Sequence, residues 1–105
     1  MAGLRSVLVI DGAESGELPA NSALHSMPFV KLSARKISEV LPDLVIMPLF
    51  GPGFDAVDAL SQLERFGFRG EVLVRTPVLP NSGIVLRELS AAAPTLRVRL
   101  AGPAD

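Results

Sequence analysis

The chain contains no cysteine, no tryptophan and no tyrosine, and only one histidine among its 105 residues. The lack of cysteine excludes disulfides, thiol nucleophiles and thiolate metal sites, and it is typical of proteins from a reducing compartment. His25 has no second histidine and no carboxylate at a metal-ligand spacing, so we expect it to be a surface residue. The missing residue types therefore remove the usual starting points for a metal-site or catalytic hypothesis.

Long hydrophobic runs are also missing, and neither sign of charge dominates. The N-terminal stretch MAGLRSVLVIDG contains no more than four consecutive apolar residues, too few for a signal peptide or a membrane span. Ten basic and eleven acidic residues give a net charge of −1, which favours neither nucleic acid nor anionic lipid as a partner. We therefore expect a cytoplasmic protein with one domain over residues 1–105, without membrane or nucleic-acid partners.

Strand-like and helix-like segments alternate along the chain. Helices are predicted over 33–41, 54–67 and 83–93, with Ser33 and Asp55 at the N-termini of the first two, and 20–27 has room for one or two helical turns. Apolar or alternating patterns predict strands over 6–11, 28–33, 43–47, 71–76 and 95–100. This alternation predicts an α/β fold with a five-stranded parallel sheet in the flavodoxin-like order 2-1-3-4-5.

The stretch PDLVIMPLFGPGFD, residues 42–55, is the most specific pattern in the chain. It resembles the receiver domain of bacterial response regulators, whose usual pattern is PDLVLLD, a loop ending in Pro-Gly, an Asp and then a helix. Residues 42–45 match this pattern without a gap, and so do Pro52, Gly53 and Asp55. The resemblance runs from roughly residue 6 to residue 103 and implies a receiver-like fold.

The same resemblance assigns the positions that carry phosphoryl-transfer chemistry in receivers. Pro48 falls on the phosphorylated aspartate, Thr76 on the hydroxyl and Gly102 on the lysine, and Asp11-Gly12 replaces the acidic pair. The chemistry needs a carboxylate nucleophile and a Mg²⁺ ion held by acidic side chains. Pro48 is not a nucleophile, and Asp11 is a single carboxylate. The resemblance therefore implies a pseudo-receiver without catalytic residues, metal or cofactor.

One face of the predicted sheet is thinly covered in comparison with receivers. Receivers place a helix between the first two strands and another after the fifth; here the first is reduced to the Gly/Pro/Ser-rich segment 12–27, and the last is absent. Strand alternation assigns five residues to this face. They are Glu71, Leu73, Arg75, Arg97 and Arg99. We expect them to form an interface in a homodimer or with a protein partner of a signalling pathway, unless 12–27 covers the face and leaves a monomer.

These observations favour a non-enzymatic interaction module that works independently of aspartyl phosphorylation. The loop 77–82 after Thr76 is a second candidate contact surface. The alternative is a small-ligand sensor in which Asp11, Pro48, Phe50 and Thr76 line a pocket at the carboxyl edge of the sheet. An enzyme is not expected, because no nucleophile and base are recognisable as a pair.

Overall fold

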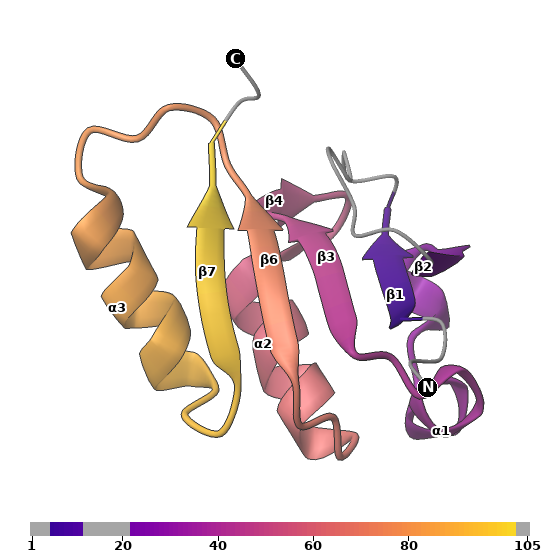
Figure 1. Ribbon diagram of the computed structural model, residues 1–105. Helices are drawn as coiled ribbons and strands as arrows, with labels where there is room; N and C mark the ends of the chain where they lie inside the picture. Colours follow the sequence, from indigo (N-terminus) through magenta and orange to yellow (C-terminus); the bar gives the residue numbers. More distant parts are fainter. Residues whose placement is uncertain (1–4, 12–21, 103–105) are drawn as a thin grey trace.

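The computed structural model describes residues 5–11 and 22–102, and its elements are labelled in Figure 1. In chain order they are β1 (Arg5–Ile10), β2 (Ser22–Met27), the 3-10 helix η1 (Phe29–Lys31), α1 (Ala34–Val40), β3 (Leu44–Pro48), β4 (Phe50–Gly51), β5 (Phe54–Asp55), α2 (Ala56–Arg65), β6 (Glu71–Arg75), α3 (Ser82–Ala92) and β7 (Arg97–Ala101).

Five strands form one parallel sheet in the order β2-β1-β3-β6-β7 (Figure 1). Counted along the chain without the short β4–β5 ribbon, this is the order 2-1-3-4-5, so the predicted flavodoxin-like topology is confirmed. Because the strands are parallel, all five carboxyl ends lie at one edge of the sheet.

The predicted position of the second strand is wrong. Residues 28–33 do not form a strand; β2 is formed by Ser22–Met27, where helical turns were expected, and Phe29–Lys31 form η1. β2 is an edge strand, and most of its side chains are accessible: Leu24 is 56% exposed. This strand is held by its ladder with β1 and not by burial of an apolar face. Its sequence therefore has no clear hydrophobic pattern.

The helices begin where their capping residues predict. The hydroxyl oxygen of Ser33 accepts a hydrogen bond from the backbone N–H of Lys36 at the start of α1. Asp55 and Asp58 form a reciprocal capping box at the start of α2. Leu41, with a φ of 48°, ends α1 in the left-handed conformation, directly before Pro42. Local polar contacts therefore fix these helix ends.

The Gly51-Pro52-Gly53 loop connects β4 and β5 in a tight antiparallel ribbon. A Cβ atom at Gly51 would lie 2.2 Å from the ring of Phe54, so a larger residue at this position would displace that buried ring. The Phe54 ring stacks on Phe29, with 4.3 Å between the ring centroids. The ribbon thus packs against the connection that follows β2.

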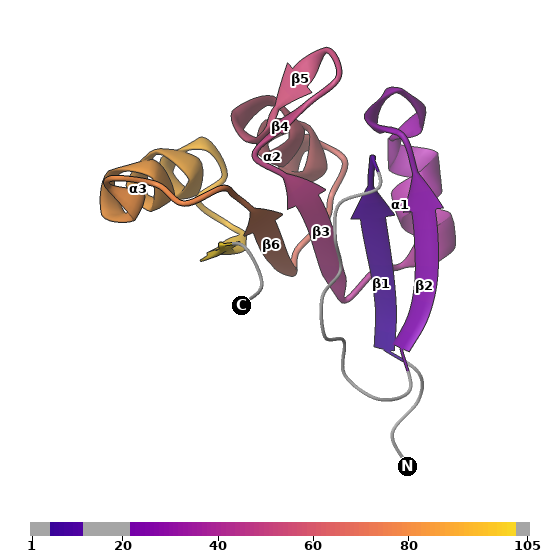
Figure 2. The same cartoon turned by 90° about the horizontal axis from the view of Figure 1, so that it is seen from above.

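The three α-helices lie on one side of the sheet, as Figure 2 shows from above. Their buried residues, among them Ile37, Leu60 and Leu89, form one core with Leu8 and Val45 of the sheet. The other side of the sheet carries a smaller apolar cluster without helical residues. Its members are Val7, Val9, Leu44 and Ile46, with Leu73 packed against them.

The first receiver helix, predicted here as reduced, and the last one, predicted as absent, would fall almost wholly on residues that the structure does not describe. Residues 12–21 and 103–105 lie outside the described part of the chain. No helix in the described ranges is long and apolar enough to cross a bilayer.

Candidate functional site

The carboxyl edge of the sheet brings together four of the five positions that the receiver resemblance singles out. Asp11 follows β1, Pro48 ends β3, Thr76 follows β6, and Gly102 follows β7. The fifth, Gly12, lies outside the described residues. Parallel topology alone explains this juxtaposition, because each residue is located at or just beyond the end of its strand.

Asp11 has a structural role at this edge. Its Oδ2 accepts a hydrogen bond of 2.8 Å from the backbone N–H of Phe29, and its own N–H donates to the carbonyl of Met27 at 3.0 Å. Its φ of 53° is in the left-handed region, which Asp tolerates better than most residues. The Asp11 carboxylate therefore connects β1 to the segment between β2 and η1, and part of its hydrogen-bonding capacity is occupied.

Pro48 occupies a strand position that does not require a backbone donor. The next residue, Leu49, donates its N–H to the carbonyl of Arg75 on β6 at 2.9 Å, so the Pro48 nitrogen faces β1 on the opposite side. The β1–β3 ladder pairs Val9 with Ile46 and ends before Pro48. A proline thus fits at this end of a central strand without loss of a ladder hydrogen bond.

The remaining edge residues do not supply the groups of a phosphoryl-transfer site. The Thr76 N–H donates to the carbonyl of Ala101 at 2.9 Å and extends the β6–β7 ladder, and the residue is buried. Gly102 is exposed, and a Cβ atom added there would meet no other atom within 4 Å. Across the described ranges, no three His, Cys, Asp or Glu residues lie close enough to hold a metal ion. The edge contains neither a nucleophile at position 48 nor a cation at position 102.

The second candidate is the helix-free face, the side of the sheet opposite the α-helices. Strand register assigns the β6 and β7 positions: Glu71 lies opposite Arg97, Leu73 opposite Arg99, and Arg75 opposite Ala101. The predicted assignment of five residues to one face agrees with this register. The same register and the β1–β3 pairing place Val7, Val9, Leu44 and Ile46 at the centre of the face.

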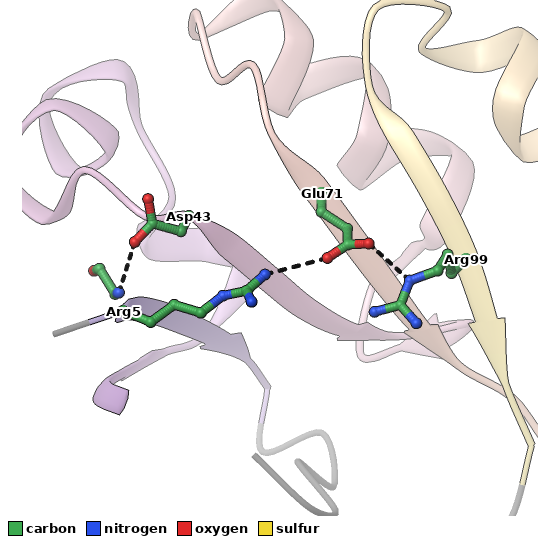
Figure 3. Close-up of polar contacts among 5 residues, drawn as sticks. Arg5, Asp43, Glu71 and Arg99 are labelled. Carbon is green, nitrogen blue, oxygen red and sulfur yellow. Dashed lines mark hydrogen bonds and ion pairs between the residues drawn. The ribbon is translucent and has the colours of Figure 1, made fainter. Parts of the chain in front are cut away.

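Glu71 links the two ends of this face (Figure 3). Its Oε2 forms an ion pair with Nε of Arg99 at 2.8 Å, and its Oε1 accepts a hydrogen bond of 3.3 Å from an Nη of Arg5. Since β3 lies between β1 and β6, the Arg5 side chain crosses β3 to reach Glu71. The Glu71 side chain is 21% exposed and that of Arg99 is 59% exposed. The carboxylate is therefore the inner member of this triad, and the arginines are the outer members.

The apolar centre of the helix-free face is closed to solvent, since Val7 and Ile46 are fully buried and Val9 and Leu44 nearly so. The predicted open apolar strip is thus not what this face presents. Over β6 and β7 its accessible part is charged, with Arg97 and Arg99 exposed, whereas Leu24 on the edge strand β2, opposite Val7, is also accessible. Among the described residues of β1, β3, β6 and β7, this face carries arginines at positions 5, 75, 97 and 99 and one carboxylate, Glu71.

Arg5 is the member of this face that the sequence interpretation missed, because the first strand was expected to begin at Ser6. The signal was present: counting back by two from Val9 and Val7 reaches Arg5 on the same face. Asp43 helps to extend the strand this far, because its Oδ2 accepts from the Ser6 N–H at 2.9 Å and its own N–H donates to the Ser6 carbonyl at 2.8 Å (Figure 3).

A groove near the carboxyl edge involves only one of the four residues expected to line a ligand pocket. Phe50 lines a groove of about 250 Å³ between α2 and α3, whereas Asp11, Pro48 and Thr76 do not line it. The groove is instead lined by helical residues such as Val57 and Val85. The small-ligand sensor remains a prediction.

The comparisons with known proteins bear on the fold. No protein-family model and no curated protein sequence matches the chain. The solution structure of two-electron reduced Megasphaera elsdenii flavodoxin is similar to this chain, with a TM-score of 0.51 and 11% sequence identity over 90% of this chain and 84% of that one. At this identity the likeness shows a shared flavodoxin-like fold, and receiver-like architecture is supported at that level.

Proposed function

We propose that this protein is a non-enzymatic interaction module, a degenerate receiver domain of a signalling pathway that docks on another protein without aspartyl phosphorylation. The docking surface is the accessible, arginine-rich part of the helix-free face. The observation that carries the proposal is the presence of exposed Arg97 and Arg99 on the side of the sheet where no described helix packs.

The chemistry of the carboxyl edge supports a function without phosphoryl transfer. An acyl phosphate requires a carboxylate at the acceptor position, and Pro48 has none. Asp11, the carboxylate that follows β1 at this edge, accepts a hydrogen bond from the Phe29 N–H that holds the β2–η1 segment. Its role is thus structural, and a single carboxylate is a poor Mg²⁺ site.

The charge of the face favours a protein partner with acidic residues over a second copy of the chain. In a two-fold dimer through this face, the same arginines would meet each other across the axis. Glu71, the carboxylate on β6, already pairs with Arg5 and Arg99. Like charges across an interface are costly, whereas opposite charges steer association and select partners. An acidic protein surface is therefore the better complement.

The test is quantitative capture of proteins from the native host with the wild-type chain and with an Arg97→Glu/Arg99→Glu double variant. The matched control is Lys31→Glu/Arg65→Glu, which makes the same charge change at exposed positions elsewhere. A specific partner is expected to bind the wild type and the control, and to bind the face variant at least about tenfold more weakly after purification, because two attractive pairs become repulsive.

Light scattering on the purified chain addresses the homodimer. We expect a monomer at low salt, with no dimer formed as the concentration rises. A dimer that persists in the Arg97→Glu/Arg99→Glu variant would contradict the proposed surface. Equal capture of the same partner by both double variants would contradict the proposal itself.

A further inference from the structure

The groove between α2 and α3 is a second surface, on the opposite side of the sheet from the helix-free face. Its floor is formed by Leu49, Ala56 and Leu89, all buried in the main core. Phe50 and Val57 form its outer wall. Leu79, from the 77–82 loop predicted as a contact surface, also lines it. The groove is thus a depression in the core that opens at the carboxyl edge.

The rim of the groove exposes large apolar side chains. Phe50 is 72% exposed and Val57 is 39% exposed, and both line the groove. Single exposed apolar residues are common, but two beside one apolar groove are typical of a surface that binds another molecule. The exposed side chains and the buried floor form one continuous apolar surface.

The charged residues that line the groove are both acidic. Asp55 caps α2, where its Oδ1 accepts from the Asp58 N–H at 2.9 Å. Glu88, on the exposed side of α3, forms no ion pair or hydrogen bond with any residue in 5–11 or 22–102. The apolar groove therefore has a negative rim, in contrast to the positive helix-free face.

We propose that this groove binds a polypeptide segment that carries an apolar anchor side chain flanked by lysine or arginine. A volume of about 250 Å³ is below the range of roughly 300–1,000 Å³ typical of pockets that enclose a whole small ligand. It suits one or two anchor side chains, while the exposed rim extends the contact along the segment. Glu88 selects basic residues beside the anchor.

This second surface makes the domain an adaptor with two faces of opposite charge. An acidic protein bound to the helix-free face and a basic polypeptide segment bound in the groove would lie on opposite sides of the sheet. The two surfaces share no residue, so failure of one leaves the other testable.

The experiment selects random peptides displayed on phage against the full chain and titrates a fluorescein-labelled selected peptide by anisotropy. Glu88→Lys and Phe50→Ala change the groove at exposed positions, so both variants are expected to fold. Glu39→Lys and Val30→Ala are the matched controls on α1 and η1. Backbone NMR shifts of Val57 and Val85 locate the bound peptide.

We expect the selected peptides to be enriched in an apolar residue flanked by Lys or Arg, and to bind each groove variant about tenfold more weakly than the wild type or the controls. Peptides without basic enrichment, or shifts confined to β6 and β7, would overturn the inference. Concentration-dependent shifts at Val57 and Val85 without peptide would assign the groove to a second copy of the chain and also overturn it.

Discussion

The Glu71 carboxylate on β6 forms an ion pair of 2.8 Å with Nε of Arg99 on β7, two residues beyond the Arg97 position with which Glu71 is paired in the parallel ladder. Arg97, directly opposite Glu71, forms no ion pair with a described residue and is exposed. The ion pair thus orients Arg99, whose side chain stays 59% exposed, and Arg97 has no described ion-pair partner, so both arginines are accessible to another protein. Their accessibility is the structural basis for the proposed arginine-rich docking surface.

The Glu71 triad is expected to contribute modestly to stability. Glu71→Gln removes the charge between Arg5 and Arg99 and should lower the free energy of unfolding by about 1 kcal/mol, the upper end for accessible ion pairs. Urea denaturation measures this loss. Glu39→Gln removes an exposed pair with Arg35 on α1 and should cost no more than about 0.5 kcal/mol. Equal effects of the two substitutions would show that the triad has no special role.

Asp11 is expected to act as a structural residue. Asp11→Ala removes the hydrogen bond to the Phe29 N–H and leaves alanine at a positive φ, so the free energy of unfolding should fall by about 2 kcal/mol. Asp11→Asn retains an acceptor and tolerates the left-handed conformation, and should cost less than about 1 kcal/mol. Thermal and urea unfolding compare the two. An alanine variant as stable as the asparagine variant would refute this role.

A new aspartate at position 48 is not expected to restore phosphorylation. In Pro48→Asp the acceptor carboxylate has Asp11 as its acidic neighbour, which is bonded to Phe29, and Gly102 supplies no cation. Intact mass spectrometry after incubation with acetyl phosphate and Mg²⁺ should detect no acyl phosphate. The matched variant adds Gly12→Asp and Gly102→Lys, which restores every position that the receiver resemblance assigns, and only this variant should become labelled. Labelling of the single variant would be inconsistent with the proposed loss of chemistry.

Glu64, at the end of the molecule away from the carboxyl edge, makes the stability of the protein depend on pH. The Thr95 hydroxyl, and next the Thr95 backbone N–H, donate to its Oε2 at 2.5 and 2.8 Å and lower the pKa of Glu64 below its ordinary value of 4.5. Because the pKa of Glu64 is lower in the folded than in the unfolded state, its ionised carboxylate stabilises the folded protein at pH values above 4.5. This stabilisation is lost as the pH falls through the pKa of the folded state.

Glu64→Gln should therefore lower the Tm relative to the wild type near neutral pH, and the difference should shrink once the pH falls below 4.5. Calorimetry or circular dichroism at several pH values gives the two Tm series. Glu39→Gln serves as the control, since Glu39 lies on α1 and does not contact Thr95. A Tm difference for Glu64→Gln that stays constant across this pH range would contradict the assignment.

Elements held by local interactions were predictable from the sequence. α2 follows from the Asp55 cap and its apolar stripe, and the central strands follow from continuous apolar runs. β2 was misplaced because its edge position requires little burial, so no alternating pattern marks Ser22–Met27. The groove was not predicted, because it depends on how α3 packs beside α2. Phe50 was named as a candidate, but its neighbours come from tertiary packing.

The most direct test of the docking proposal is photocrosslinking in living cells of the native host. A benzophenone amino acid replaces exposed Arg97 in one variant and exposed Val30 of η1 in the control. The expected result is a covalent adduct with a protein that has an acidic surface, formed from position 97 but not from position 30, in cells where the chain carries no acyl phosphate. The absence of any adduct from position 97, or the same adducts from both positions, would contradict a docking function for the arginine-rich face.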